Sequence, residues 1–161
     1  MTQQEIIHGC KNQEPKYQKA LVLRYSGLLM TVCRRYLGQR EMAKDVLQEA
    51  LIKIFRALPN YTERGAFVGW MQKIVANTAL QHLNKAHLKI EAVTLEEVEE
   101  EVHLPDIYGL LAAEELIDLI QTLPIGFRTV FNLYAIEGYS HREIAQLLDI
   151  CLLYTSDAAD E

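Results

Sequence analysis

The stretch Asp45-Val-Leu-Gln-Glu-Ala-Leu-Ile-Lys-Ile-Phe55 decides the fold class, because its apolar residues recur three and four positions apart. That spacing places them on one side of an α-helix, which we expect to run from about residue 39 to residue 57. Leu58-Pro59 ends this helix, because a residue before proline is disfavoured in the α conformation. The inner face comprises Val46, Leu47, Ala50, Leu51, Ile54 and Leu58.

Helical spacing recurs on both sides of this stretch. Thr2-Gln-Gln-Glu5 has the pattern of a capping box that opens a short helix. Pro15 opens the next helix and Gly38 ends it. The apolar stripe of that helix comprises Tyr17, Leu21, Tyr25, Leu28, Leu29, Val32 and Tyr36. A further long helix is expected from about residue 66 to residue 89. No run combines strand spacing with hairpin turns, so we predict an all-α fold.

Charge divides the chain into two unlike halves. Residues 1–90 contain 14 Lys and Arg against 6 Asp and Glu, whereas residues 91–161 contain 2 against 16. A basic half indicates a polyanion site there, although lysines also serve simply to solvate helix faces. Residues 91–108 are rich in glutamate and contain Pro105, so we expect an acidic linker. It joins two small helical domains, residues 1–90 and residues 109–150.

A face of mixed chemistry lies beside the apolar face of the helix predicted over residues 39–57. It combines two acids, an amide, an isoleucine and a phenylalanine: Asp45, Gln48, Glu49, Ile52 and Phe55. Such a mixture suits a surface that docks on another protein. The alternative is an ordinary solvated helix in which Phe55 belongs to the core, and spacing alone favours this alternative.

The long helix that follows carries an aromatic residue, two amides and two lysines on one face: Trp70, Lys73, Asn77, Gln81 and Lys85. Aromatic rings stack on bases, amides hydrogen-bond to base edges and lysines pair with phosphates. Tyr61, Arg64 and Phe67 precede this helix in a predicted loop, where they would line a pocket for a flipped base. The alternative is that Phe67, Trp70, Met71 and Ile74 simply pack the core, and it is strong for Trp70.

The segment Gly138-Tyr-Ser-His-Arg-Glu-Ile-Ala-Gln-Leu-Leu148 has the pattern of the first helix of a helix-turn-helix. Ser140 and Glu143 form a capping box, Ile144 and Leu148 face inward, and the small Ala145 lets a second helix cross closely. That second helix would read the major groove and would carry Lys or Arg. Residues 151–161 contain no basic residue and resemble a sequencing adapter translated in frame. We therefore expect a non-native tail in place of the recognition helix.

Several functional classes lack their sequence features. No apolar run approaches the length of a bilayer-spanning helix, and the N-terminal residues do not have the pattern of a secretory signal. The three cysteines have no paired spacing and the five histidines no metal-ligand spacing. Neither a phosphate-binding glycine loop nor a nucleophile elbow is present. We therefore predict a cytoplasmic protein that is not an enzyme and that uses no metal or cofactor.

In their order and separation, these motifs resemble the bacterial sigma factors of the extracytoplasmic-function (ECF) group, within the sigma-70 family. The residues from Asp45 to Phe55 resemble the helix with which such factors bind the clamp helices of RNA polymerase. The run from Phe67 through Trp70 to Asn77 is similar to their helix for the single-stranded −10 element.

The resemblance continues in the second half of the chain. The segment from Leu123-Pro124 to Leu148 is similar to the opening of the −35-binding domain of the family, whose recognition helix would follow Ile150. Residues 1–90 then correspond to sigma region 2 and residues 109–150 to part of region 4. The resemblance implies two partners, core RNA polymerase and promoter DNA, and many members also bind an anti-sigma factor.

Two other functional classes stay open from the residues alone. A stand-alone helix-turn-helix regulator would bind duplex DNA without polymerase. A helical adaptor would bind only protein and would have no affinity for nucleic acid.

Overall fold

The computed structural model describes residues 1–85 and 113–148 of the 161-residue chain. The chain divides into two compact units, Met1–Ala86 and His87–Glu161, and each is considered by itself. The described residues are helical and contain no strand, which confirms the predicted all-α fold. The predicted acidic linker, the end of the long helix beyond residue 85 and the predicted non-native tail lie outside the described residues.

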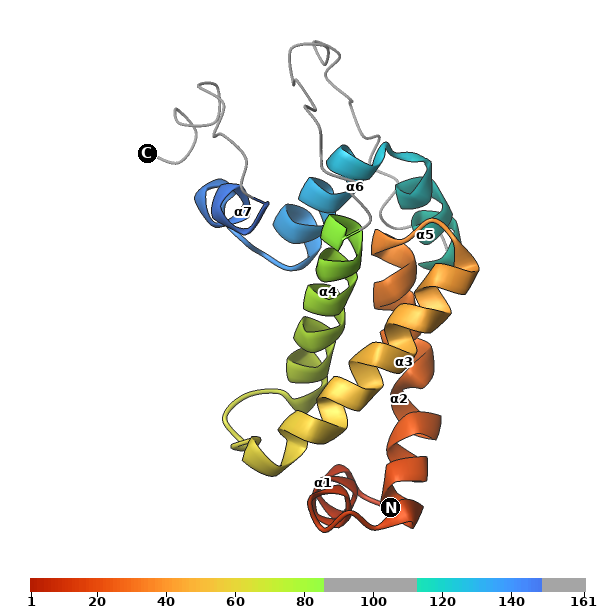
Figure 1. Cartoon of the computed structure of the whole chain (residues 1–161), viewed down its shortest axis with the longest axis vertical. Helices are drawn as coiled ribbons and strands as arrows, with labels where there is room; N and C mark the ends of the chain where they lie inside the picture. Colours follow the sequence, from red (N-terminus) through yellow and green to blue (C-terminus); the bar gives the residue numbers. More distant parts are fainter. Residues whose placement is uncertain (86–112, 149–161) are drawn as a thin grey trace. The chain divides into compact units, whose positions relative to one another are not determined.

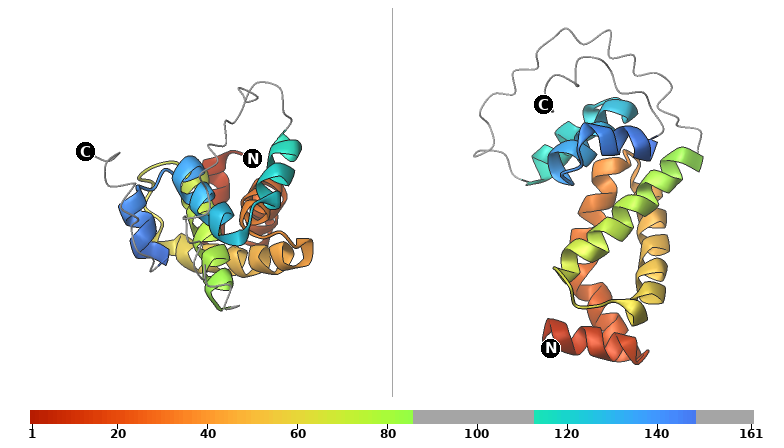
Figure 2. Two further views of the ribbon diagram at one scale, coloured as in Figure 1. Left: turned by 90° about the horizontal axis from the view of Figure 1, so that it is seen from above. Right: turned by 90° about the vertical axis from the view of Figure 1, so that its left-hand side faces the viewer.

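The first unit consists of three long helices and one short helix (Figure 1). The long helices α2 (Pro15–Tyr36), α3 (Arg40–Ala57) and α4 (Phe67–Lys85) pack against one another in every pairing. The short helix α1 (Gln3–Lys11) lies across the N-terminal end of α2 and also contacts the 3₁₀ turn η1 (Leu58–Asn60) (Figure 2). This arrangement leaves one side of both α3 and α4 facing solvent.

The core of this unit is formed by the apolar faces predicted from the sequence. Five of the six inner-face residues predicted for α3 are buried, and Leu51 is partly exposed. In α2 the prediction is wrong for Leu28, which is 42% exposed. Its neighbour Leu29 faces the core instead. Successive side chains of an α-helix point about 100° apart, so Leu28 and Leu29 cannot both face inward. The bounds of α3 agree with those predicted to within one residue.

Helix α1 approaches α2 closely because of a glycine. A Cβ atom placed on Gly9 would lie 2.1 Å from the ring of Tyr17, so a side chain larger than hydrogen does not fit there. The predicted capping box at the start of α1 is present. The Glu5 amide donates to the Thr2 hydroxyl at 3.2 Å, and the Thr2 amide donates to the Glu5 carboxylate at 2.6 Å. This backbone hydrogen bond lowers the pKa of Glu5.

Two cysteines of the first unit lie inside its core. Cys10 and Cys33 are both free thiols and both buried. Burial disfavours the charged thiolate, so the pKa of Cys10 is raised and that of Cys33 is raised to about 12. Among the described residues, no cluster of His, Cys, Asp and Glu is arranged to hold a metal ion. None of the described helices is long and apolar enough to cross a membrane.

The second unit is built from shorter helices, α5 (Ala113–Thr122), α6 (Ile125–Phe131) and α7 (His141–Leu148). A π-helical turn, η3 (Asn132–Ile136), continues α6. The helical stretch from Ile125 to Ile136 is therefore not regular throughout. Within residues 113–148, the buried hydrophobic side chains are those of Ile117, Ile120, Leu133 and Ile144.

The turn before α7 has the geometry predicted from the sequence. Gly138 has a φ angle of +78°, a conformation that favours glycine. The Glu143 amide donates to the Ser140 hydroxyl at 3.2 Å, and the Ser140 amide donates to the Glu143 carboxylate at 2.8 Å. Ser140 and Glu143 therefore form the predicted capping box, which fixes the start of α7.

Candidate nucleic-acid interface and docking face

The mixed face predicted on α3 reaches solvent along its length. Asp45 and Gln48 are exposed, Ile52 is 53% exposed, and Glu49 and Phe55 are partly exposed. Phe55 is therefore not enclosed in the core, as the solvated-helix alternative required. An exposed isoleucine between acids and an amide is a surface that water solvates poorly and that a protein partner can cover. We call these five residues the docking face.

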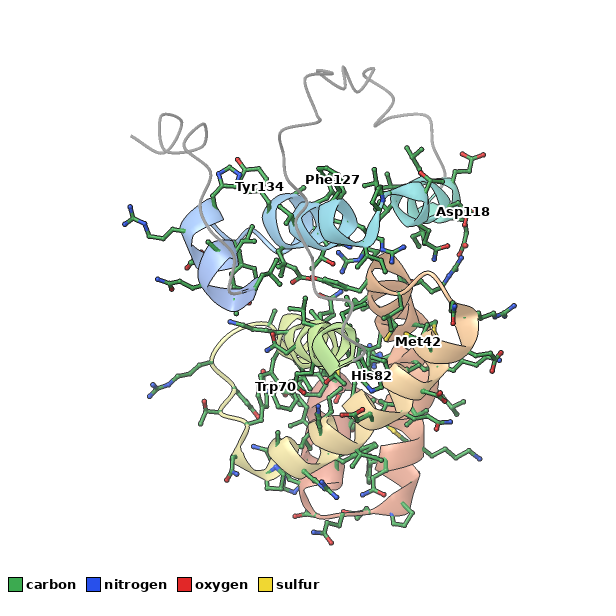
Figure 3. The ribbon with its side chains drawn as sticks, turned by 45° about the horizontal axis from the view of Figure 1, so that its top comes forward. Met42, Trp70, His82, Asp118, Phe127 and Tyr134 are labelled. Carbon is green, nitrogen blue, oxygen red and sulfur yellow. The ribbon has the colours of Figure 1, made fainter. Side chains whose placement is uncertain are left out.

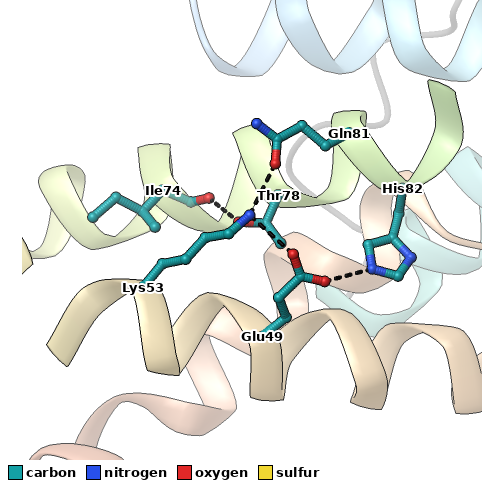
Figure 4. Close-up of polar contacts among 6 residues, drawn as sticks. All are labelled: Glu49, Lys53, Ile74, Thr78, Gln81 and His82. Atoms are coloured by element: carbon teal, nitrogen blue, oxygen red, sulfur yellow. Dashed lines mark hydrogen bonds and ion pairs between the residues drawn. The ribbon is translucent and has the colours of Figure 1, made fainter. Parts of the chain in front are cut away.

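A polar network joins the docking face to α4 (Figure 4). One carboxylate oxygen of Glu49 accepts from Lys53 Nζ at 3.0 Å, and the other lies 2.7 Å from His82 Nε2. Lys53 Nζ also donates to Gln81 Oε1 at 2.8 Å and to Thr78 Oγ1 at 3.4 Å. The hydrogen bond from His82, followed by that from Lys53, lowers the pKa of Glu49. Glu49 thus belongs both to the docking face and to the contact between the helices.

The predicted nucleic-acid face of α4 lies on its solvent side. Lys73, Asn77 and Gln81 are exposed, and Trp70 is partly exposed (Figure 3). The side chain of Lys85 lies outside the described part of the chain. An aromatic edge, a cation and two amides are therefore available together to a polyanion with unpaired bases. We call Trp70, Lys73, Asn77 and Gln81 the α4 face.

For Phe67 the structure favours the core alternative over the loop pocket. Phe67 is the first residue of α4, not a loop residue, and it is only 1% exposed. Its ring lies between Tyr25 at 5.9 Å, Tyr61 at 5.3 Å and Trp70 at 5.7 Å. Tyr61 is also buried, at 7% exposure. The rings of Tyr25, Tyr61 and Phe67 pack the core near the N-terminal end of α4. Of the aromatic residues predicted to bind DNA, Trp70 is therefore the one whose ring is partly exposed.

The loop that carries Arg64 is held at two points. The Tyr61 carbonyl accepts a hydrogen bond from Lys11 Nζ at 2.9 Å, and the Tyr61 hydroxyl donates to the Gly65 carbonyl at 3.3 Å. Gly65 has a φ angle of +101°, which lets the chain turn back toward α4. Arg64 is exposed between these two points. The guanidinium therefore extends from a constrained loop at the start of the α4 face.

Two residues with a part in these surfaces were missed from the sequence. Lys53 stands four residues after Glu49, and this spacing could have indicated their ion pair. Its contact with Gln81, 28 residues further along the chain, had no local signal. Lys11 likewise contacts a residue 50 positions away.

In the second unit, the predicted first helix of the helix-turn-helix is α7. Ile144 is buried as predicted, whereas Ala145 and Leu148 are only partly buried. The ring of Tyr134 stacks on that of His141, with ring centres 4.4 Å apart and planes 5° apart (Figure 3 labels Tyr134). This stacking fixes α7 against the π-helical turn.

Comparisons with known proteins relate both units to one protein family. The family model of sigma-70 region 2 matches residues 21–88, and that of sigma-70 region 4 matches residues 113–150. Together the two matches cover more than half of the chain. The first range contains the docking face and the α4 face, and the second contains α5, α6 and α7.

Two relatives with the same protein name illustrate the similarity. The chain is 29% identical to the ECF RNA polymerase sigma-E factor of Escherichia coli K12, over 92% of this chain and 84% of that protein. It is 27% identical to the protein of the same name from Haemophilus influenzae, over 92% and 85%. The family models, the relatives and the helical architecture agree, and the chain belongs to the sigma-70 family of RNA polymerase sigma factors, in its ECF group.

Proposed function

We propose that the chain directs core RNA polymerase to promoters by using α3 and α4 for different partners. The docking face binds polymerase, and the α4 face holds the non-template strand of the melted −10 element. Polymerase performs the chemistry, so this chain acts in the cytoplasm as a specificity factor and not as an enzyme. The observation that carries the proposal is the pair of solvent-facing surfaces on adjacent helices, one of mixed protein-binding character and one with a base-stacking ring, amides and a cation.

The docking half of the proposal is tested best at Ile52. A buried apolar anchor at the centre of an interface contributes far more than the polar residues around it. We expect Ile52→Asp to abolish capture of core polymerase while the helical circular dichroism spectrum stays unchanged. Leu23→Asp is the matched control, because Leu23 is 72% exposed and lies on α2, which carries none of the docking-face residues. Equal loss in both variants, or in neither, would remove Ile52 from the interface.

Charge reversal on the docking face should avoid Glu49, because that residue also holds α3 to α4. Asp45→Lys combined with Gln48→Ala changes the face and leaves the network intact. Central charge reversal in an interface costs a few kcal/mol, so we expect polymerase affinity to fall at least tenfold.

The nucleic-acid half is tested with polymerase and a fork-junction DNA that carries a single-stranded −10 element. Asn77→Ala should reduce discrimination between base sequences more than overall affinity, because an amide reads a base edge. Lys73→Ala should weaken all sequences alike and flatten the salt dependence by about 0.7 for one lost phosphate contact. If neither variant changes binding, the α4 face does not hold the strand.

The same assay separates the two other functional classes. A stand-alone regulator would bind a duplex operator without polymerase, and an adaptor would bind polymerase without affecting DNA. Capture of an anti-sigma factor would add a regulator of the same surfaces, as in many members of the family.

A further inference from the structure

We propose that Lys53 is a positioning residue for promoter reading: it holds the Gln81 amide so that only its NH₂ group meets the DNA. This inference deepens the proposed function and rests on it. Lys53 lies on α3, and among the described residues the predicted DNA-binding side chain to which it donates a hydrogen bond is that of Gln81. Its effect on base reading would therefore pass through that amide.

The Lys53 ammonium contacts polar groups of both α3 and α4 (Figure 4). It has three hydrogen atoms to donate and three acceptors within reach: Glu49 Oε1 at 3.0 Å, Thr78 Oγ1 at 3.4 Å and Gln81 Oε1 at 2.8 Å. The Thr78 hydroxyl donates its own hydrogen to the Ile74 carbonyl at 2.7 Å, which leaves its lone pairs for Lys53. The protein thus offers one acceptor for each of the three ammonium hydrogens.

The hydrogen bond from Lys53 fixes the orientation of the Gln81 amide. Oxygen and nitrogen of an amide are often hard to tell apart, but an ammonium can only donate, so the atom 2.8 Å from Lys53 must be the oxygen. The NH₂ group then points away from Lys53, as Figure 4 shows. Gln81 is exposed, so that group is open to a ligand.

A donor-only amide selects among bases. It accepts a partner that presents a carbonyl oxygen, such as O4 of thymine, and rejects one that presents an exocyclic amine in the same place, such as N4 of cytosine. A freely rotating amide would accept either by turning over. Lys53 therefore makes the contact of Gln81 selective for a base that presents a carbonyl oxygen.

The Glu49 carboxylate keeps Lys53 in place. One of its oxygens lies 3.0 Å from the ammonium, and the other is held by His82 Nε2 at 2.7 Å. Both helices therefore contribute to the position of one ammonium group. An exposed ion pair contributes little to stability, so the value of this network lies in orientation.

The test uses the full chain with core polymerase and fork-junction DNAs in which thymine replaces cytosine at each single-stranded −10 position in turn. We expect Gln81→Ala to reduce the thymine-to-cytosine affinity ratio at one position. Lys53→Met should reduce the same ratio by roughly three- to tenfold, the value of one ordinary hydrogen bond. The double variant should match Gln81→Ala alone. Lys44→Met is the control, because Lys44 lies on the same helix in an exposed ion pair with Glu41.

Three outcomes would overturn the proposal. In the first, Lys53→Met leaves the thymine-to-cytosine affinity ratio unchanged. In the second, Lys53→Met reduces that ratio further in the Gln81→Ala background. In the third, Lys53→Met flattens the salt dependence, as the loss of a phosphate contact would. Gln81→Glu supplies a second variant on an exposed side chain. It keeps the bond to Lys53 and removes the donors, so it should weaken binding more than Gln81→Ala.

Failure of this inference can be told apart from failure of the proposed function. Asn77→Ala and Lys73→Ala are measured on the same DNAs. If they reduce binding while the Lys53 and Gln81 variants do not, the α4 face holds DNA without this device. If none of these variants has an effect, the nucleic-acid half of the proposed function itself fails.

Discussion

Lys11 of the first helix holds the backbone of Tyr61, with its ammonium 2.9 Å from the Tyr61 carbonyl oxygen. The same ammonium lies 5.9 Å from the centre of the Tyr61 ring. Helix α1 precedes the range matched by the region 2 family model, which starts at residue 21. A segment outside the family pattern therefore supports the loop from which Arg64 extends.

The first prediction concerns this contact. Lys11→Met should cost about 1–3 kcal/mol of unfolding free energy, because a hydrogen bond from a charged donor to a half-buried carbonyl is lost. The loss should be local, with faster hydrogen exchange at residues 61–65 than in α3. Lys19→Met on α2 is the matched control and should leave both measurements unchanged. Uniform acceleration of exchange over the unit would contradict a local role.

The second prediction compares two glycines. Gly9→Ala should destabilise the first unit by about 1–3 kcal/mol, because the new methyl group collides with the Tyr17 ring. Gly27→Ala should stabilise it by up to about 1 kcal/mol, since it lies within α2 and no atom lies within 4 Å of the added Cβ. Urea unfolding of the two variants measures both signs. A neutral Gly9→Ala would mean that α1 moves aside without cost.

The third prediction separates packing from base stacking. Phe67→Ala should cost about 3–5 kcal/mol of stability, because a ring that is 1% exposed leaves a cavity. Trp70→Ala should cost less stability and should weaken binding to the −10 strand by about 1–3 kcal/mol if its ring stacks on a base. Thermal melts and fork-junction binding are run side by side. A stable Phe67→Ala protein with weakened DNA binding would reverse these assignments.

The fourth prediction concerns pH. The pKa of Glu49 is lowered by His82 and Lys53, so the contribution of its charge to stability is complete above the ordinary glutamate pKa. That contribution is lost as the pH falls through the lowered value. His82→Leu should raise the pKa of Glu49 more than Lys53→Met does, because the hydrogen bond from His82 is the larger cause. Carboxyl ¹³C titration measures this shift, and Glu5, which is held by Thr2, should titrate unchanged.

Local signals in the sequence predicted most of the fold. Capping boxes at Thr2 and Ser140 and the proline after Leu58 mark helix ends through hydrogen bonds and sterics confined to a few residues. The apolar spacing of α3 identified its buried face for the same reason. The π-helical turn at 132–136 was not predicted, because an inserted residue changes hydrogen bonding without a distinct composition.

The candidate site was predicted less completely. The solvent side of α4 follows from spacing, but Phe67, Trp70 and Met71 all satisfy a helical core pattern, so spacing could not say which ring is enclosed. The contacts of Lys11 and Lys53 depend on tertiary packing between distant segments. The sequence predicted the groups that we propose to bind DNA, and the fold shows which groups contact them.

The burial of Cys10 and Cys33 makes the first unit suitable for site-specific labelling. A maleimide reacts with the thiolate, and a thiol with a pKa near 12 supplies almost none at neutral pH. With Cys151 replaced by serine, a cysteine introduced at Gln48 or Asn77 would be modified far faster than either buried thiol. Dyes at these two positions would report separately, and in real time, when polymerase arrives and when the DNA strand is captured.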